Sequence, residues 1–288
     1  MEENWTILKV LQWTAGYFGR KGIDQPRANA EVLLAHVLGK ERIELYLNYD
    51  QPLTPDELSR YREAVRRRSC REPVQYITRR QEFWSLEFEV NPAVLIPRPE
   101  TELLVERALE LLPDAPARVL DLGTGSGAIA VVLARERPSF SVVATDRSPD
   151  ALDVARRNAL RHGVGDRISF LAMDLFSGFS LSRCSFDLII SNPPYIGERE
   201  FQCLPPEIAG HEPRSALRGG GAEGLDIIRR IVAEAPRCLN TGGSMLLEIG
   251  LGQAEPLQNE LANNPHFEER RFFKDYSGIM RILYLRKR

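Results

Sequence analysis

Apolar residues recur every three or four positions through about the first 73 residues, the period of amphipathic helices. The stretch LTPDELSRYREAVRRR opens with a capping box, in which Thr54 is the N-cap and Glu57 stands at the third helical position. The stretch QPRANAEVLLAHVLG ends at Gly39, a residue typical of a helix C-cap. Residues 1–73 contain neither a glycine-rich loop nor a polar cluster suited to catalysis. We therefore predict a small, all-helical substrate-recognition domain over residues 1–73.

The pattern then changes to alternation. Apolar and polar residues alternate on both sides of Ser85, which predicts a short hairpin inside a proline-stiffened linker of residues 74–98. From residue 99 to residue 288 strand and helix patterns alternate, as in a parallel α/β sheet. The predicted strands are 118–122, 141–146, 168–172, 186–191 and 244–249, and a predicted helix spans 149–161 with Ser148 as its N-cap. The last two apolar segments, RRFFKD and RILYLRK, are separated by too few residues for a parallel crossover, so we predict an antiparallel C-terminal pair.

Composition removes several classes of protein. No uncharged apolar run approaches the length of a membrane-spanning helix, and the acidic start MEEN argues against an export signal. The four scattered cysteines, Cys70, Cys184, Cys203 and Cys238, indicate reduced thiols in a cytoplasmic protein, and the histidines show no ligand spacing, so we predict no metal. The formal net charge of −2 argues against broad nucleic-acid binding. The arginine-rich run 60–71 is interpreted as a solvated helix face, with a docking patch for an acidic or RNA-bearing partner as the alternative.

A glycine loop, VLDLGTGSGAIA, connects a predicted strand to a helix. Gly123, Gly125 and Gly127 would let the backbone turn tightly and approach a ligand at the helix N-terminus. Their spacing is not that of dinucleotide-binding folds or P-loops, which favours a smaller nucleoside-bearing cofactor. Asp146, at the end of the next strand, would accept the ribose hydroxyls, and Asp121 is placed to meet an amino group. The alternative is that the glycines only pack a helix on a strand and Asp146 caps a turn.

Two prolines interrupt the chain at the end of the fourth predicted strand, in SNPPY. They remove two N–H donors, so that the remaining polar groups are acceptors, the side-chain oxygen of Asn192 and the carbonyl of Pro193. Two acceptors suit a planar NH₂ group, which has two protons to donate, and Tyr195 would offer an aromatic wall. The alternative for Asn192 to Tyr195 is a strand-ending turn. Asp174, after the third strand, would either meet a base edge or cap a turn.

Taken together, these motifs resemble methyltransferases that act on a planar nitrogen. The stretches LIPRPETELLVERAL, NPPYI, HEPRSALRGG, EGLDIIRRI and EIGLGQ resemble the PrmC/HemK family in particular, from about residue 76 to the C-terminus. The resemblance implies a class I, Rossmann-like methyltransferase domain that uses S-adenosylmethionine. It also implies that the substrate is the glutamine side-chain amide in the Gly-Gly-Gln motif of peptide chain release factors. The expected partner is thus a protein, without a membrane or sequence-specific nucleic-acid binding.

By this resemblance, each motif is expected to have a role. Asn192 and Pro193 would be catalytic, and the substrate would contact Asn192, Pro193, Pro194 and Tyr195. The cofactor would contact Asp121, Gly123, Thr124, Gly125, Ser126, Gly127, Asp146, Asp174, Leu175 and Asn192. The sequence departs from its relatives at Arg79, where glycine is usual, and at Leu175, where some have an aromatic residue. An adenine-type nucleic-acid methyltransferase would use the same NPPY chemistry on a flipped base, but it would want a basic face.

One long segment, 197–222, shows no clear regular structure in the sequence. Loops of this length are usually functional or disordered. Glu212 and Arg214 would either order it as a lid over the substrate or be solvated, and we favour the lid.

Overall fold

The computed structural model describes residues 5–179 and 185–288, and these form two compact units. The helical unit consists of the chain up to Arg80 together with Pro205–His211. The sheet unit consists of Gln81–Leu204 and Glu212–Arg288. Met1–Asn4 and Cys184 lie outside the described residues, while Cys70 and Cys203 are exposed free thiols and Cys238 is buried. None of the described helices is long and apolar enough to span a membrane.

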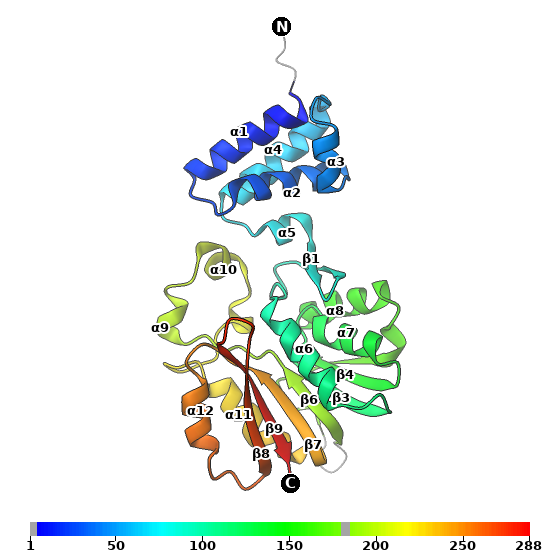
Figure 1. Cartoon of the computed structure of the whole chain (residues 1–288), viewed down its shortest axis with the longest axis vertical. Coiled ribbons are helices and arrows are strands. Elements are labelled where there is room, and N and C mark those ends of the chain that lie inside the picture. Colours follow the sequence, from blue (N-terminus) through cyan, green and yellow to red (C-terminus); the bar gives the residue numbers. More distant parts are fainter. Residues whose placement is uncertain (1–4, 180–184) are drawn as a thin grey trace. The chain divides into compact units, whose positions relative to one another are not determined.

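The helices of this unit up to residue 78 pack around one apolar core, to which the helix Pro206–His211 adds no buried residue (Figure 1 shows these helices). Its helices are α1 (Ile7–Arg20), α2 (Pro26–Leu38), α3 (Arg42–Leu47), α4 (Pro55–Ser69), α5 (Val74–Thr78) and α10 (Pro206–His211). The predicted capping box is present, because the hydroxyl of Thr54 accepts from the N–H of Glu57 and the Glu57 carboxylate accepts from the N–H of Thr54. Gly39 ends α2 with a φ of +63°, as predicted.

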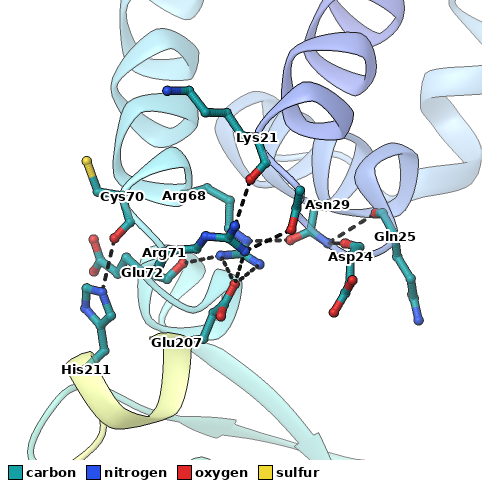
Figure 2. Close-up of polar contacts among 11 residues, drawn as sticks. Lys21, Asp24, Gln25, Asn29, Arg68, Cys70, Arg71, Glu72, Glu207 and His211 are labelled. Atoms are coloured by element: carbon teal, nitrogen blue, oxygen red, sulfur yellow. Dashed lines mark hydrogen bonds and ion pairs between the residues drawn. The ribbon is translucent and has the colours of Figure 1, made fainter. Parts of the chain in front are cut away.

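Most arginines of the run 60–71 form ion pairs with acidic residues of the helical unit. Arg60 pairs with Asp56, Arg66 with Glu63 and Arg67 with Glu72. Arg68 is buried, and its guanidinium contacts the side chain of Asn29 at 2.8 Å and that of Glu207 at 3.2 Å. Arg71 pairs with the same carboxylate of Glu207 at 3.1 Å (Figure 2). The interpretation of a solvated helix face therefore fails for Arg68, whose role is to hold α10 against α4.

A second buried charge lies under α3. The side chain of Glu31 is 1% exposed and accepts hydrogen bonds from Arg27 Nε (2.6 Å), Arg42 Nη2 (2.7 Å) and the Tyr46 hydroxyl (2.6 Å). Burial by itself raises the pKa of this carboxyl, but the three donors outweigh burial and hold the pKa below its usual 4.5. Glu31 thus joins α2 to α3 as a fully compensated anion.

The sheet unit contains a two-stranded sheet and a seven-stranded one (Figure 1). β1 (Arg80–Phe83) pairs with β2 (Leu86–Glu89). The large sheet has the order β5-β4-β3-β6-β7-β9-β8, in which β9 is antiparallel to both of its neighbours and the other pairs are parallel. Its strands are β3 (Ala117–Leu122), β4 (Phe140–Asp146), β5 (Ile168–Ala172), β6 (Phe186–Ser191), β7 (Leu239–Glu248), β8 (Phe267–Lys274) and β9 (Met280–Lys287).

Alternate residues of the central strands bury their side chains on opposite faces of this sheet. Val119 belongs to the apolar cluster under α6 (Glu100–Leu111), α7 (Ala128–Glu136) and α8 (Pro149–Arg161). Leu120 belongs to the cluster under α11 (Asp226–Glu234) and α12 (Ala254–Leu261). The fold class predicted from the sequence, a mostly parallel α/β sheet with an antiparallel C-terminal pair, is confirmed, including the place of β6 beside β3.

Three details of the structure bear on the sequence-based expectations. β7 begins at Leu239, whereas the predicted strand began at residue 244. Leu239 pairs with β6, the pairing is interrupted over the stretch that contains Gly242 and Gly243, and it resumes at Ser244. The segment 197–222 is not free of regular structure, since it contains α9 (Glu198–Phe201), α10 and a 3₁₀ turn. Arg79 has a φ of +58°, a conformation that costs glycine little, so an arginine there is held under local backbone strain.

Candidate active site

The loop after β3 turns through three glycines before α7 begins. Gly123, Gly125 and Gly127 have φ values of +71°, +55° and +82°, in the region that residues with a side chain seldom adopt. The N–H of Gly123 donates to the carbonyl of Thr145 at 2.8 Å, which ties the loop to the end of β4. A Cβ at Gly127 would lie 3.0 Å from the Cβ of Ala155, whereas Gly123 and Gly125 face open space. The loop thus leaves room for a ligand on one side and packs on α8 on the other.

Two aspartates flank this loop. Asp121 is fully buried, and its Oδ2 accepts from the hydroxyl of Thr124 at 2.6 Å, while its Oδ1 has no partner within the described residues. Burial raises the pKa of Asp121 to about 7, and the bond from Thr124 offsets part of that rise. Asp146 accepts from the N–H groups of Gly125 at 3.0 Å and Ser148 at 2.9 Å, and burial raises its pKa as well. Each carboxylate keeps acceptor capacity that the protein does not use.

A cavity of about 350 Å³ lies at the carboxyl ends of these strands, within the size range of ligand sites. Its lining includes Gly123, Thr124, Gly125, Ser126, Asp146, Asp174, Leu175, Asn192 and Pro194, all predicted from the sequence. Asp121, Gly127, Pro193 and Tyr195 are not among the lining residues. Asp174 lines the cavity, and its carboxylate forms an ion pair with Arg230 at 2.8 Å.

The SNPPY segment follows β6 and is held by buried polar groups. Asn192 donates from Nδ2 to the hydroxyl oxygen of Thr101 at 3.0 Å, and Thr101 donates to Glu248 Oε2 at 2.7 Å. The Tyr195 hydroxyl donates to the other oxygen of Glu248 at 3.2 Å. Burial raises the pKa of Glu248 to about 7, with the hydrogen bonds from Thr101 and Tyr195 acting against it. Within the described residues, no protein donor reaches Asn192 Oδ1.

The backbone of the SNPPY segment is also held by Gln253, a residue that follows β7. Gln253 donates from Nε2 to the carbonyls of Tyr195 at 2.8 Å and Glu223 at 2.7 Å, and its Oε1 accepts from Gly250 N–H at 2.8 Å. A Cβ at Gly224, which has a φ of +73°, would lie 2.0 Å from the carbonyl oxygen of Tyr195. The glycine-rich stretch 219–224 is therefore needed for close backbone packing against SNPPY.

Glu212 lies at the point where the 197–222 segment re-enters the sheet unit. It is 4% exposed and accepts from the N–H of Ile96 at 3.2 Å and from Arg98 Nη2 at 2.5 Å. The alternative that Glu212 is solvated is therefore wrong. This buried carboxylate anchors the segment to residues 96–98. Arg214 lines the cavity.

Sequence reasoning assigned no role to Thr101, Glu248 or Gln253. All three stand in the stretches that carried the family resemblance, PRPETE and EIGLGQ. A signal was present for Glu248, since a carboxylate that ends the apolar strand SMLLE has to find buried donors.

The site suits a cofactor that carries an amino group and a ribose. The glycine loop supplies open backbone and Asp146 lines the cavity at the end of β4, while Asp121, in the strand that leads into the loop, has a buried Oδ1 without a hydrogen-bond partner within the described residues but does not itself line the cavity. Within residues 5–179 and 185–288, no group of three or more His, Cys, Asp or Glu residues is arranged to hold a metal ion.

The chain matches two family models. The PrmC N-terminal domain matches residues 9–78, and the methyltransferase small domain matches residues 99–204. A relative from Geobacter sulfurreducens, the release factor glutamine methyltransferase, is 50% identical over 88% of this chain and 87% of its own length. The protein of that name from Escherichia coli is 42% identical over 82% of this chain and 83% of its own length.

Solved structures agree at the level of the fold. The N-terminal domain of human METTL16 in complex with SAH is 18% identical, with a TM-score of 0.51, over 69% of this chain and 74% of that one. A methyltransferase from Pyrococcus furiosus is 22% identical, with a TM-score of 0.51, over 71% of this chain and 90% of that one. With relatives of 40–50% identity along nearly the whole chain, this protein belongs to the release factor glutamine methyltransferase family.

Proposed function

We propose that this enzyme transfers a methyl group from S-adenosylmethionine to the side-chain amide nitrogen of the glutamine in the Gly-Gly-Gln motif of a peptide chain release factor. The observation that carries the proposal is the setting of Asn192. Its Nδ2 is occupied by Thr101, and its Oδ1 has no protein donor within the described residues. An acceptor beside the cavity suits a substrate that donates from an NH₂ group.

S-adenosylmethionine is the methyl donor of this family, and it supplies a methyl group activated by a sulfonium. Asp146 would hold its ribose hydroxyls, and the backbone of Gly123 to Gly127 would lie along it. Asp121 is kept as the candidate partner of its amino group, because Oδ1 lacks a hydrogen-bond partner within the described residues, although Asp121 is not among the residues that line the cavity. Leu175 would flank its base, and Asp174, paired with Arg230, would stand at the rim of that part of the cavity.

The protein has to overcome the poor nucleophilicity of an amide nitrogen. Its lone pair is conjugated with the carbonyl group, and the corresponding resonance barrier in peptides is about 18–20 kcal/mol. Alignment of the nitrogen with the methyl group can contribute up to about 7–11 kcal/mol. Hydrogen bonds from the NH₂ group to Asn192 Oδ1 and the Pro193 carbonyl would strengthen as positive charge develops on nitrogen. These two acceptors would therefore stabilise the transition state more than the bound substrate.

Replacement of Asn192 tests this role. Asn192→Ala should lower kcat about 10²–10³-fold, the usual cost of removing one such positioned group, while cofactor affinity changes little. Asn192→Asp should retain more activity than Asn192→Ala, because a carboxylate still accepts the bond. The measurement is methyl transfer from labelled cofactor to purified release factor, with cofactor binding followed by calorimetry.

A change in the substrate gives the matching control. A release factor whose Gly-Gly-Gln glutamine is replaced by glutamate lacks the NH₂ group and should not be labelled. Labelling of that variant, or of duplex DNA at a comparable rate, would contradict the proposed target.

We further propose that the helical unit binds the protein substrate and takes no part in the chemistry. Three apolar side chains of α3 are exposed, Ile43, Tyr46 and Leu47, with Leu47 77% exposed. Exposed apolar groups on one short helix are suited to contact with another protein. Among the described residues of the helical unit, no group resembles the acceptor cluster around Asn192.

A further inference from the structure

The amide of Asn192 serves the proposed chemistry in one orientation only. With Oδ1 toward the substrate it accepts from an NH₂ group, and after a half-turn of the amide it would present Nδ2, a donor that repels the same group. Something in the protein must therefore distinguish the two ends of this side chain. The chain Asn192–Thr101–Glu248 contains the groups that can do so.

We propose that Thr101 and Glu248 are positioning residues that fix which end of the Asn192 amide faces the substrate. The proposal rests on the function proposed above. A threonine hydroxyl has a single proton, and Thr101 gives that proton to Glu248 Oε2 at 2.7 Å. The Thr101 oxygen can then only accept, and Nδ2 is the only end of the Asn192 amide that can donate to it, at 3.0 Å. Oδ1 is left for the substrate.

The direction of this relay depends on the ionised form of Glu248. An ionised carboxylate only accepts, which forces both hydroxyls, those of Thr101 and Tyr195, to point toward it. A protonated Glu248 could donate to the oxygen of Thr101. The Thr101 proton would then be free to turn toward Asn192 and stabilise the reversed amide.

The groups around Glu248 allow its carboxyl to change protonation state near neutral pH. The carboxyl is buried at the end of β7 with two neutral hydroxyls as its hydrogen-bond partners. Of the charged groups around it, Arg281 of β9 favours the ionised form and Glu100 of α6 opposes it, while Tyr195 contributes its hydroxyl. Its pKa of about 7 implies that the relay is complete above neutral pH and is lost as the pH falls through this value.

Substitutions in the full-length enzyme separate the relay from simple packing. Thr101→Val keeps the shape but removes the hydroxyl, and we expect kcat to fall about 10–100-fold, because a small misplacement of an active-site group can cost up to about 10²-fold. Thr101→Ser keeps the hydroxyl and should restore most of kcat. Thr78→Val, at another buried threonine outside the site, is the matched control and should leave kcat unchanged.

The pH profile tests the other end of the relay. Wild-type kcat should decline as the pH falls through about 7, and Glu248→Gln should lower kcat about tenfold and remove this decline. Combined with Thr101→Val, the second change should add little, because both act on the same chain of bonds. Wild-type kcat in Thr101→Val, or a Thr101→Ser variant as inactive as Thr101→Val, would overturn the proposal.

A readout without substrate keeps the relay and the proposed function apart. The side-chain ¹⁵N–¹H₂ signals of Asn192, assigned by their loss in Asn192→Asp, should shift on Thr101→Val and Glu248→Gln but not on Thr78→Val. If wild-type enzyme labels no release factor, the proposed function fails, and these signals still decide the relay. Signals that stay unchanged in both variants would overturn it.

Discussion

Glu31 in the helical unit and Glu248 in the sheet unit are both glutamates with almost no solvent exposure, 1% and 2%. Their partners differ. Glu31 accepts from two arginines and a tyrosine, and its pKa lies below 4.5. Glu248 accepts from two neutral hydroxyls, and burial raises its pKa to about 7. A buried glutamate is therefore ionised at neutral pH in the helical unit (Glu31), whereas in the sheet unit (Glu248) it titrates near neutral pH.

This difference separates a carboxylate that holds the fold from one that is placed for chemistry. Guanidinium partners compensate the loss of hydration, so ionised Glu31 stabilises the contact between α2 and α3. Hydroxyl partners compensate it only in part, so the ionised form of Glu248 costs stability above neutral pH. The pKa of Asp121 also reaches about 7, and this residue lies in the sheet unit as well, in the strand β3 that leads into the glycine loop. Raised pKa values of this kind cluster at functional sites.

The largest effect is expected at Glu31. Glu31→Ala removes the common partner of Arg27, Arg42 and Tyr46 and should lower the free energy of unfolding by about 3 kcal/mol. This is the low end for a broken buried pair, because Arg27 and Arg42 are part exposed and can be hydrated. Urea unfolding followed by a probe in the helical unit is the measurement.

Glu63→Ala is the matched control, because Glu63 pairs with Arg66 at the surface of the same unit and should change stability very little. Equal losses from the two substitutions would mean that Glu31 is no more than a surface charge, and the contrast with Glu248 would fail.

A smaller effect, of the opposite kind, is expected at Glu248. Its pKa in the folded state is raised from 4.5 to about 7, so the folded protein holds the proton more tightly and loses stability as the pH rises through this interval. Between about pH 5 and pH 7 this group should cost the wild type about 2 kcal/mol, a loss that Glu248→Gln should not show. Unfolding free energies of the two proteins at a series of pH values give the difference. Parallel curves would place the pKa of Glu248 near its ordinary value.

The smallest effect concerns the division of labour between the units. Leu47→Ser, on the exposed face of α3, should raise KM for the release factor by an amount equivalent to about 1 kcal/mol and leave kcat and the unfolding curve unchanged. Leu160→Ser is the control, because Leu160 is 72% exposed on α8 of the sheet unit. Similar changes in KM for both variants would remove the special role proposed for the helical unit.

Much of the sheet unit could be predicted from local patterns. The predicted strand 186–191 and helix 149–161 have the observed bounds, because strong apolar periodicity and a serine N-cap mark them within a few residues. The glycine loop, Asp146 and Asn192 were likewise found through short motifs with a physical meaning, and they meet at one cavity.

The relay around Asn192 could not be found in this way. Thr101 and Glu248 lie 147 positions apart, and only the packing of α6 against the end of β7 brings them together. The membership of Pro205–His211 in the helical unit has the same cause, since it depends on Arg68 and Arg71 meeting Glu207 far along the chain. Periodicity reports which face of an element is buried, but it does not report which polar groups meet there.

Because Pro205–His211 belongs to the helical unit, this unit cannot be completed early during synthesis on the ribosome. The helical unit lacks α10 and Glu207 until the chain has been made through His211, more than a hundred residues after Arg80. At about 5–20 residues per second, this leaves Arg68 and Arg71 without Glu207 for roughly 7–28 seconds. The N-terminal part of this enzyme is therefore completed only when most of the sheet unit has already left the ribosome, and an mRNA that ends before the codon for Glu207 would yield an unfinished first unit.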